Sequence, residues 1–214
     1  MQDDLIVFGA AYSAYTRIVR LVLAEKDIAH RFEEIDFIAE GPDAARQAGH
    51  PFGRVPILVH GERRLFETSA ITLYLDWMWP SPALIPANAF AAAQMASAVS
   101  ALDHYVWPSI RELCTQRLFA PLASGWPDEQ VIERMVKRLQ TDLSAFEDAY
   151  CEDLFTRTKV TLADLHALPM VAYLMMTPEG ATLMARHPRL SDWWAWIAAR
   201  PSIAATDFDL ASYP

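Results

Sequence analysis

A serine stands where the sequence pattern changes from strand to helix. Residues 5–8 form a short, wholly apolar run, and a helical pattern of apolar residues begins at residue 14, directly after Ser13. Because a helix N-terminus carries unpaired N–H groups and about half a positive charge, it attracts an anion. A hydroxyl there can donate a hydrogen bond to that anion, although the simpler interpretation of a lone serine is that it only caps the helix.

Two further segments carry residues suited to holding a small peptide. Val55 precedes Pro56 at the start of a predicted strand, and a cis bond there would leave the backbone N–H and C=O of Val55 free to pair with an extended peptide. Glu67 can bind an ammonium group, while Thr68 and the N-terminus of the following helix can bind a nearby carboxylate. Glu67-Thr68 alone is more often a helix cap, so only the combination of segments indicates a ligand site.

The elements around these segments follow one order. Strands are predicted at residues 5–8, 32–37, 55–59 and 63–66, and helices at residues 14–26, 43–47 and 67–77. The order βαβ, short helix, ββα is that of a thioredoxin-like domain, which we expect to span residues 1–80. Pro80, Pro82 and Pro86 then mark a linker at residues 81–88, because proline cannot continue a helix and stiffens what it joins.

The second half of the chain has only helical patterns. They cover residues 89–119, 127–150, 165–176, 179–186 and 190–200. We expect Pro108 to kink the first of these helices. Thr161 and Asp164 form a capping box before the third, which is apolar almost all round and should be buried. The predicted fold class is therefore α+β, a thioredoxin-like N-terminal domain followed by an all-α helical bundle at residues 89–214.

Composition and charge exclude several classes of function. A net charge of −9 argues against a nucleic-acid partner, whose phosphates require clustered lysine and arginine. The N-terminus lacks the basic start and apolar core of a signal peptide, and no apolar stretch is long enough to cross a bilayer. Cys114 and Cys151 have neither disulfide nor metal-ligand spacing, so we expect no metal, no membrane and a reducing cytoplasm.

Together the three segments resemble those of glutathione transferases, and the phi class with its theta relatives most closely. The phi pattern Ser-x-x-Thr-Arg after the first strand matches Ser13, Thr16 and Arg17. Further motifs of the family, beginning with Asn-Pro-Phe-Gly-Gln-Val-Pro and Leu-Phe-Glu-Ser-x-Ala-Ile, have counterparts at residues 50–56, 65–71, 161–166 and 200–202. The resemblance covers nearly the whole chain with its spacings kept.

The resemblance implies that glutathione is conjugated to a hydrophobic electrophile, or used to reduce a hydroperoxide, without a cofactor. It makes Ser13 the donor that holds the glutathione sulfur as a thiolate. Val55, before the expected cis-Pro56, would clamp the cysteinyl part of the tripeptide through its backbone. Glu67 and Thr68 would hold the γ-glutamyl end.

The resemblance also implies an electrophile site and a dimer. Tyr12, Leu113 and Phe119 would contribute to the apolar site for the electrophile, and Phe52 would contact the partner subunit of a homodimer. An aromatic ring on a surface loop is costly unless it is covered, which is a further reason to expect the dimer.

This chain departs from the phi pattern near the glycyl end of glutathione. Phi enzymes commonly carry His and Lys in the loop before the second helix, whereas the matching positions here are Gly41 and Pro42, which have no donor side chain. Arg54 replaces the usual Gln at the clamp, and Arg46 lies between Pro42 and Arg54 in the sequence. We expect weaker or differently arranged binding of the glycyl carboxylate, with Arg54 as the leading substitute and Arg46 as the second.

Four alternatives stand beside this hypothesis, two of which the sequence disfavours. Tyr12 competes with Ser13, because other transferase classes use a tyrosine near this point. Thiol exchange is disfavoured by the absence of cysteine at residues 10–16, and a triad of Ser13, His166 and Asp164 by the use of Asp164 in the capping box. A non-catalytic binding or scaffold protein with the same fold is the alternative outside enzymes.

Overall fold

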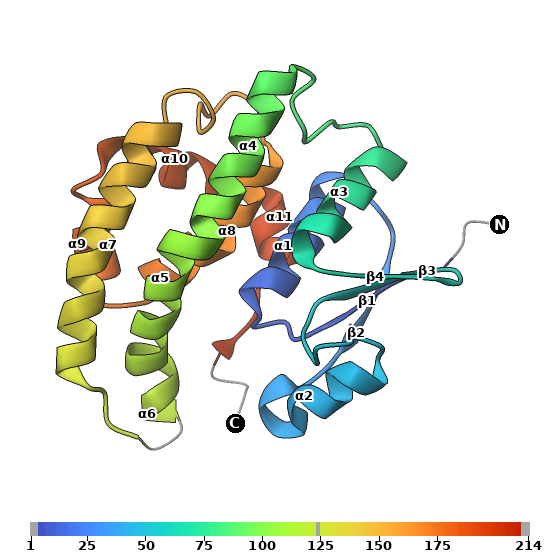
Figure 1. Cartoon of the computed structure of the whole chain (residues 1–214), viewed down its shortest axis with the longest axis horizontal. Helices are drawn as coiled ribbons and strands as arrows, with labels where there is room; N and C mark the ends of the chain where they lie inside the picture. Colours follow the sequence, from blue (N-terminus) through green and yellow to red (C-terminus); the bar gives the residue numbers. More distant parts are fainter. Residues whose placement is uncertain (1–3, 123–124, 211–214) are drawn as a thin grey trace. The chain divides into compact units, whose positions relative to one another are not determined.

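The computed structural model describes residues 4–122 and 125–210, which form two compact units (Figure 1). The first unit holds the described residues up to Ala83 and those from Arg200 onward, and the second runs from Leu84 to Ala199. Every strand of the described chain belongs to the first unit, and the second is built of helices. The expected fold class, a thioredoxin-like domain followed by a helical one, is confirmed.

The sheet of the first unit has a mixed four-stranded topology. Its strands are β1 (Leu5–Gly9), β2 (Arg31–Glu34), β3 (Ile57–His60) and β4 (Arg63–Phe66). Their order is β2-β1-β3-β4, with β1 parallel to β2 and antiparallel to β3, and β3 antiparallel to β4. Val7 lies opposite Phe32 on one side and Leu58 on the other and is fully buried. The apolar run is therefore an inner strand of the sheet, with Leu5 and Val7 on the buried face, whereas Ile6 and Phe8 on the other face are partly exposed and not fully covered as the apolar run predicted.

Three helices of the first unit are α1 (Ala14–Glu25), α2 (Phe37–Gln47) and α3 (Thr68–Met78). The second begins earlier than the sequence predicted. Asp36 caps it, because its side chain accepts the N–H groups of Ile38 and Ala39 at 3.1 Å each. The residue that we expected to end the second strand, Phe37, therefore opens a helix, which is interrupted at Gly41, where φ is 70°.

The C-terminal segment differs from the expected division at residues 81–88 and 89–214. Residues from Arg200 onward, including the short helix α11 (Pro201–Ala205), belong to the first unit, and Figure 1 shows α11 beside α1. The carboxylate of Glu25 on α1 accepts two hydrogen bonds from the Arg200 guanidinium, at 2.8 and 2.6 Å. The buried Arg17 guanidinium donates to the Thr206 hydroxyl at 3.4 Å. These side-chain contacts, between residues far apart in sequence, join the C-terminal segment to α1.

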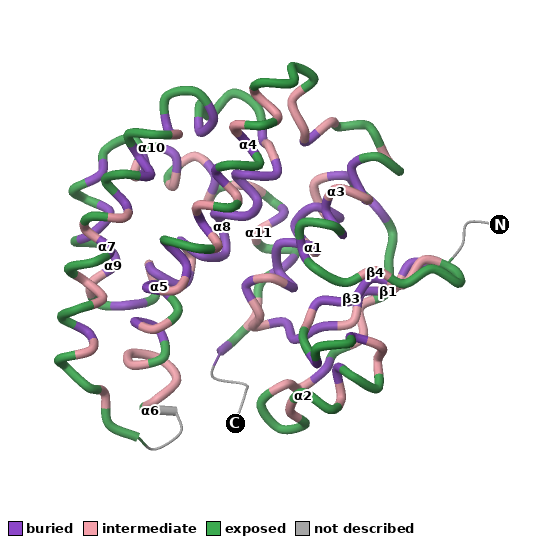
Figure 2. The backbone as a smooth tube through the Cα atoms, in the orientation of Figure 1, coloured by how far each residue is buried: buried purple, intermediate pink, exposed green. Residues whose placement is uncertain are grey.

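The second unit consists of one long interrupted helix and several separate ones. In order they are α4 (Ala89–Ala101), η1 (Leu102–Val106), α5 (Trp107–Cys114), η2 (Thr115–Phe119), α6 (Ala120–Leu122), α7 (Glu129–Tyr150), α8 (Leu162–Met175), α9 (Gly180–Met184) and α10 (Pro188–Ile197). Most residues of α8 are buried, as its apolar sequence predicted (Figure 2). None of the helices in the described parts of the chain is both long and apolar enough to span a membrane.

The kink expected at Pro108 takes the form of a π-helical turn. In η1, the Trp107 N–H binds the carbonyl of Leu102, five residues back instead of the usual four. A proline inside a helix has no N–H to donate, and its ring clashes with the carbonyl four residues earlier. A wider turn relieves such a clash, which explains why the helix changes register just before Pro108.

Side-chain caps also define helix starts in this unit. The predicted capping box is confirmed, since Thr161 accepts the Asp164 N–H while the Asp164 carboxylate accepts the Thr161 N–H at 2.7 Å. The same carboxylate accepts a hydrogen bond from the indole of Trp193 at 2.8 Å, which joins α8 to α10. The start of α7 differs from the prediction, because Asp128 caps it and Pro127 precedes the cap instead of lying in the first turn.

Candidate active site

Ser13 lies at the N-terminus of α1, as the sequence predicted. Its N–H closes the loop after β1 by binding the carbonyl of Ala10 at 3.0 Å, and its side-chain oxygen accepts the N–H of Thr16 at 3.3 Å. The capping role is therefore real. Capping does not prevent Ser13 from also binding a ligand, because an oxygen that accepts through a lone pair can still donate its hydroxyl hydrogen.

The loop that carries Ser13 is held closely against the start of α1. A Cβ atom added to Gly9 would lie 2.5 Å from both the methyl carbon and the hydroxyl oxygen of Thr16, closer than any side chain tolerates. Glycine is thus required at the end of β1 for this close approach.

Tyr12, the competitor of Ser13, has its hydroxyl oxygen buried within the protein. Ser13 is partly exposed. Both residues as a whole are partly exposed, but a thiol that arrives from solvent must reach the hydroxyl that activates it, so the buried hydroxyl makes Tyr12 the weaker candidate for the donor to sulfur.

The expected clamp lies in the turn between α2 and β3. The bond between Val55 and Pro56 is cis, as the sequence suggested. The turn is closed by the Gly53 N–H, which donates to the carbonyl of His50 at 3.1 Å, and by the Phe52 N–H, which donates to Nδ1 of His50 at 3.2 Å. The clamp residues therefore follow closely after His50, for which the sequence indicated no functional role.

His50 is a buried residue at the centre of the charged groups around the clamp. Its ring packs against that of Phe66, with centroids 5.2 Å apart, and only 3% of the residue is exposed. The pKa of His50 is lowered, first because burial disfavours the imidazolium and also because of the positive charge of Arg54, while the carboxylate of Glu67 opposes this shift. Arg54 and Glu67, both predicted to bind glutathione, therefore lie within electrostatic range of one buried ring.

Glu67 has an uncommon backbone conformation at the start of α3. Its φ is 70°, in the region that favours glycine, and its side chain makes no cap hydrogen bond although the residue stands at the N-cap. Glu67 is exposed, whereas the neighbouring Thr68 is buried. Strained residues of this kind concentrate at ligand sites, where strain serves to aim a side chain. The exposed carboxylate beside the N-terminus of α3 can reach a ligand from solvent.

The segment that lacks the usual His and Lys lies inside α2, at its interruption, and not in a loop before the helix as expected, and it contacts the clamp turn. A Cβ atom added to Gly53 would lie 2.7 Å from the carbonyl oxygen of Pro42 and 3.2 Å from the guanidinium carbon of Arg46. Arg46 also forms an exposed ion pair with Asp43 at 2.6 Å. Arg54 is exposed on the clamp itself. Both arginines named from the sequence are thus close to this turn, and both are exposed, although the Arg46 guanidinium is already paired with Asp43.

Two of the three residues expected at the electrophile site lie in the second unit and differ in exposure. Phe119 in η2 is partly exposed, and its ring centroid lies 6.2 Å from that of Tyr173. Leu113 in α5 is fully buried, so its side chain belongs to the core of the unit. On this evidence Phe119 is the better candidate for contact with a ligand.

The described residues give little support to a Ser-His-Asp triad, a reactive cysteine or a metal site. Asp164 is occupied by Thr161 and Trp193, and Nε2 of His166 lies 2.9 Å from the carboxylate of Asp103. Cys114 and Cys151 are buried, and burial raises the pKa of each thiol to about 12. Among the residues whose placement is described, no group of three metal-binding side chains comes together.

Comparison with protein families accounts for this arrangement. The chain matches the N-terminal domain of glutathione S-transferases over residues 7–83 and their C-terminal domain over residues 105–201. This chain therefore belongs to the glutathione transferase family.

Individual relatives point to the plant phi-like branch of that family. The chain is 30% identical to glutathione S-transferase F7 of Arabidopsis thaliana, over 92% of this chain and 95% of the relative. It is also 30% identical to glutathione S-transferase 3 of Zea mays, over 94% of this chain and 92% of the relative. Among solved structures, glutathione transferase F7 of Populus trichocarpa has a TM-score of 0.82 at 29% identity, covering 94% of this chain and 97% of the other.

Proposed function

We infer that this chain is an enzyme that conjugates glutathione to hydrophobic electrophiles in the cytoplasm. The thiol of glutathione loses its proton to solvent, the thiolate attacks an electrophilic carbon, and a C–S bond forms as a leaving group departs with the bonding electrons. The observation that carries this proposal is a partly exposed serine at the N-cap of α1, at the end of a loop that begins with the close contact of Gly9 and Thr16. Detoxification is the role that such a reaction serves.

The magnitudes are consistent with activation by Ser13. A free thiol has a pKa of about 8.5, so only a few per cent is thiolate at neutral pH. Lowering that pKa by about two units requires roughly 2.7 kcal/mol of preferential stabilisation of the thiolate. One hydrogen bond to a charged atom contributes about 1.5–3 kcal/mol and a helix N-terminus about 0.3–1 kcal/mol. Ser13 and its helix are together sufficient, so the proposal needs no cofactor.

We propose that the rest of glutathione is held by the residues named from the sequence. The backbone of Val55, before Pro56, pairs with the cysteinyl part, and Glu67 with Thr68 holds the γ-glutamyl end. Arg54 holds the glycyl carboxylate, with Arg46 as the alternative. The proximity of Arg54 and Glu67 to His50 supports a single site with a positive and a negative end, which suits a zwitterionic tripeptide.

Retention on immobilised glutathione, followed by turnover of a panel of electrophiles and hydroperoxides, tests this function. We expect retention and turnover of at least one electrophile. Retention without any turnover would favour the non-catalytic binding protein, and a chain that is neither retained nor active would contradict the proposal. The panel also distinguishes conjugation from hydroperoxide reduction.

Glu67→Gly should raise stability and weaken glutathione binding at the same time. Glycine relieves the strain of a φ of 70°, which we expect to add about 1 kcal/mol to the free energy of unfolding. Loss of the carboxylate should raise the dissociation constant of glutathione roughly tenfold or more. Denaturant unfolding and calorimetric titration measure the two effects.

Asp27→Gly is the matched control for Glu67→Gly. Asp27 is a second non-glycine residue with positive φ, at 51°, and it lies after α1 at the opposite end from Ser13. Its replacement should also raise stability but leave glutathione affinity unchanged. If both variants bind glutathione like the wild type, Glu67 does not contact the ligand.

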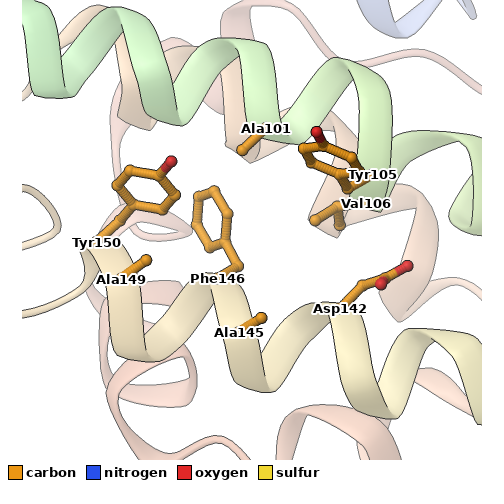
Figure 3. Close-up of a pocket in the computed structure, with 8 residues that line it drawn as sticks. All are labelled: Ala101, Tyr105, Val106, Asp142, Ala145, Phe146, Ala149 and Tyr150. Atoms are coloured by element: carbon orange, nitrogen blue, oxygen red, sulfur yellow. The ribbon is translucent and has the colours of Figure 1, made fainter.

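We also propose that the chain forms a homodimer in which Phe52 is covered. The Phe52 side chain stands on the clamp turn, and 69% of the residue is exposed. The second unit carries an apolar pocket of about 330 Å³ between η1 and α7, where the rings of Tyr105, Phe146 and Tyr150 surround a hollow (Figure 3). Its lining residues are Ala101, Tyr105, Val106, Asp142, Ala145, Phe146, Ala149 and Tyr150. We propose that this pocket receives the Phe52 ring of a second copy.

Phe52→Ser should convert the dimer to a monomer at micromolar concentration, as measured by sedimentation velocity. Ala145→Trp, which fills the pocket, should have the same effect from the other side. Trp126→Ser is the control, because Trp126 is 93% exposed and lies outside the pocket, so its loss should leave the dimer intact. A wild-type monomer would contradict the dimer, and a dimer in both Phe52→Ser and Ala145→Trp would contradict this contact.

A further inference from the structure

Glu34 links the end of β2 to the loop that carries Ser13. It is the last residue of β2, and its Oε1 accepts the backbone N–H of Ala11 at 2.9 Å. Ala11 is buried and stands two residues before Ser13. A buried peptide N–H requires a partner, and a carboxylate oxygen is a stronger acceptor than a neutral one.

Backbone hydrogen bonds hold the chain on both sides of Ala11. Gly9 pairs with Glu34 in the sheet, and the N–H of Ile35 donates to the carbonyl of Gly9 at 2.9 Å. On the other side of Ala11, the Ser13 N–H binds the carbonyl of Ala10 at 3.0 Å. The hydrogen bond from Ala11 to Glu34 therefore fixes the orientation of the Ala11 N–H between these two backbone hydrogen bonds. Its loss would let the loop rotate without breaking the sheet.

We propose that Glu34 is a positioning residue for the thiol-activating hydroxyl of Ser13. This inference rests on the proposed function for its catalytic consequence but not for its structural one. Glu34 has two opposing effects on a bound thiol. Its hydrogen bond holds the loop so that the hydroxyl meets the sulfur, whereas its negative charge disfavours a thiolate nearby. Substitutions that separate the bond from the charge can therefore distinguish the two effects.

Glu34→Gln and Glu34→Ala make that separation. Glutamine keeps an acceptor oxygen and removes the charge, so the pKa of the bound glutathione thiol should stay the same or fall, with kcat within about twofold of the wild type. Alanine removes the acceptor as well, so that pKa should rise by about one unit and kcat at neutral pH should fall roughly tenfold. The ultraviolet absorbance of the thiolate, followed against pH, measures the pKa directly.

Glu33→Ala is the matched control on the same strand. Glu33 pairs with Arg31 at 3.0 Å, and neither residue binds the Ser13 loop, so this variant should behave like the wild type. Binding of S-methylglutathione, which has no ionisable thiol, should be unchanged in all three variants. An effect of Glu34→Ala that is confined to the pH profile and kcat separates positioning from general damage to the fold.

Amide hydrogen exchange tests the structural part independently of activity. Exchange at the Ala11 amide should become at least tenfold faster in Glu34→Ala and remain unchanged in Glu34→Gln and Glu33→Ala. If Glu34→Gln and Glu34→Ala give the same pH profile, or if the Ala11 amide is no less protected in Glu34→Ala, the inference is wrong. A wild-type protein without glutathione turnover would instead contradict the proposed function, while hydrogen exchange would still decide whether Glu34 holds the loop.

Discussion

Ser13→Ala should remove most of the conjugating activity while glutathione still binds. The substitution deletes the hydroxyl that donates to the sulfur, so the pKa of the bound thiol should rise and the thiolate fraction at neutral pH should fall. A hydrogen bond to a charged atom contributes about 1.5–3 kcal/mol, which corresponds to a roughly ten- to hundredfold loss of kcat. The clamp around Val55 and Glu67 is untouched, so the dissociation constant of glutathione should change by less than about threefold.

The same substitution removes a helix cap, and this effect needs its own control. Loss of an N-cap side chain costs about 1 kcal/mol of stability. Asn88→Ala removes an equivalent cap at the start of α4, where the Asn88 side chain accepts the N–H of Ala91 at 3.0 Å. We expect similar losses of stability in Ser13→Ala and Asn88→Ala but a loss of kcat only in the first.

Tyr12→Phe completes the comparison. If Ser13→Ala kept turnover close to that of the wild type while Tyr12→Phe lost it, the assignment of the sulfur donor to Ser13 would be wrong. The buried hydroxyl of Tyr12 leads us to expect the opposite result, with Tyr12→Phe close to the wild type.

Lys26→Met should cause a large loss of stability. The Lys26 side chain is fully buried at the end of α1, and its ammonium group lies 2.6 Å from the Asp76 carboxylate on α3. It also donates to the carbonyls of Trp79 and Pro82, at 2.7 and 2.6 Å. Removing one partner of a buried ion pair leaves the other charge poorly compensated, at a cost of about 3–5 kcal/mol. Denaturant unfolding should detect a loss of this size, since a native protein has only about 5–15 kcal/mol in total.

An exposed ion pair provides the control for Lys26→Met. Arg138 and Asp142 lie one helical turn apart on α7 with a 3.3 Å contact, and the Arg138 side chain is 55% exposed. Arg138→Met should therefore cost less than about 1 kcal/mol. If Lys26→Met cost no more than Arg138→Met, the buried pair would not stabilise the unit.

A double-mutant cycle can separate the ion pair from its surroundings. In Lys26→Met with Asp76→Asn, no uncompensated carboxylate remains, so the combined loss should be smaller than the sum of the two single losses. The difference measures the coupling between the two charges. Additive losses would mean that Lys26 acts mainly through the carbonyls of Trp79 and Pro82.

Much of the fold and of the candidate site followed from short segments of sequence. Apolar periodicity located the strands and helices, and the spacing of Thr161 and Asp164 predicted a capping box that the structure contains. Ser13, Glu67 and the cis bond before Pro56 were named because the segments that carry them resemble those of glutathione transferases, and the structure contains the cis bond. Interactions within three or four residues depend little on the rest of the molecule, and this is why sequence alone can predict them.

Long-range contacts were decided only by the tertiary structure. The bond from Glu34 to Ala11, the burial of Lys26 beside Asp76 and the position of His50 join groups from different elements. The same is true of the C-terminal segment, which belongs to the first unit and in which Arg200 binds Glu25 of α1. Such contacts depend on how elements pack and which side chains meet there, so no pattern within one segment reveals them. The chemistry of this protein could therefore be identified from its sequence, whereas the contacts that position that chemistry required the folded chain.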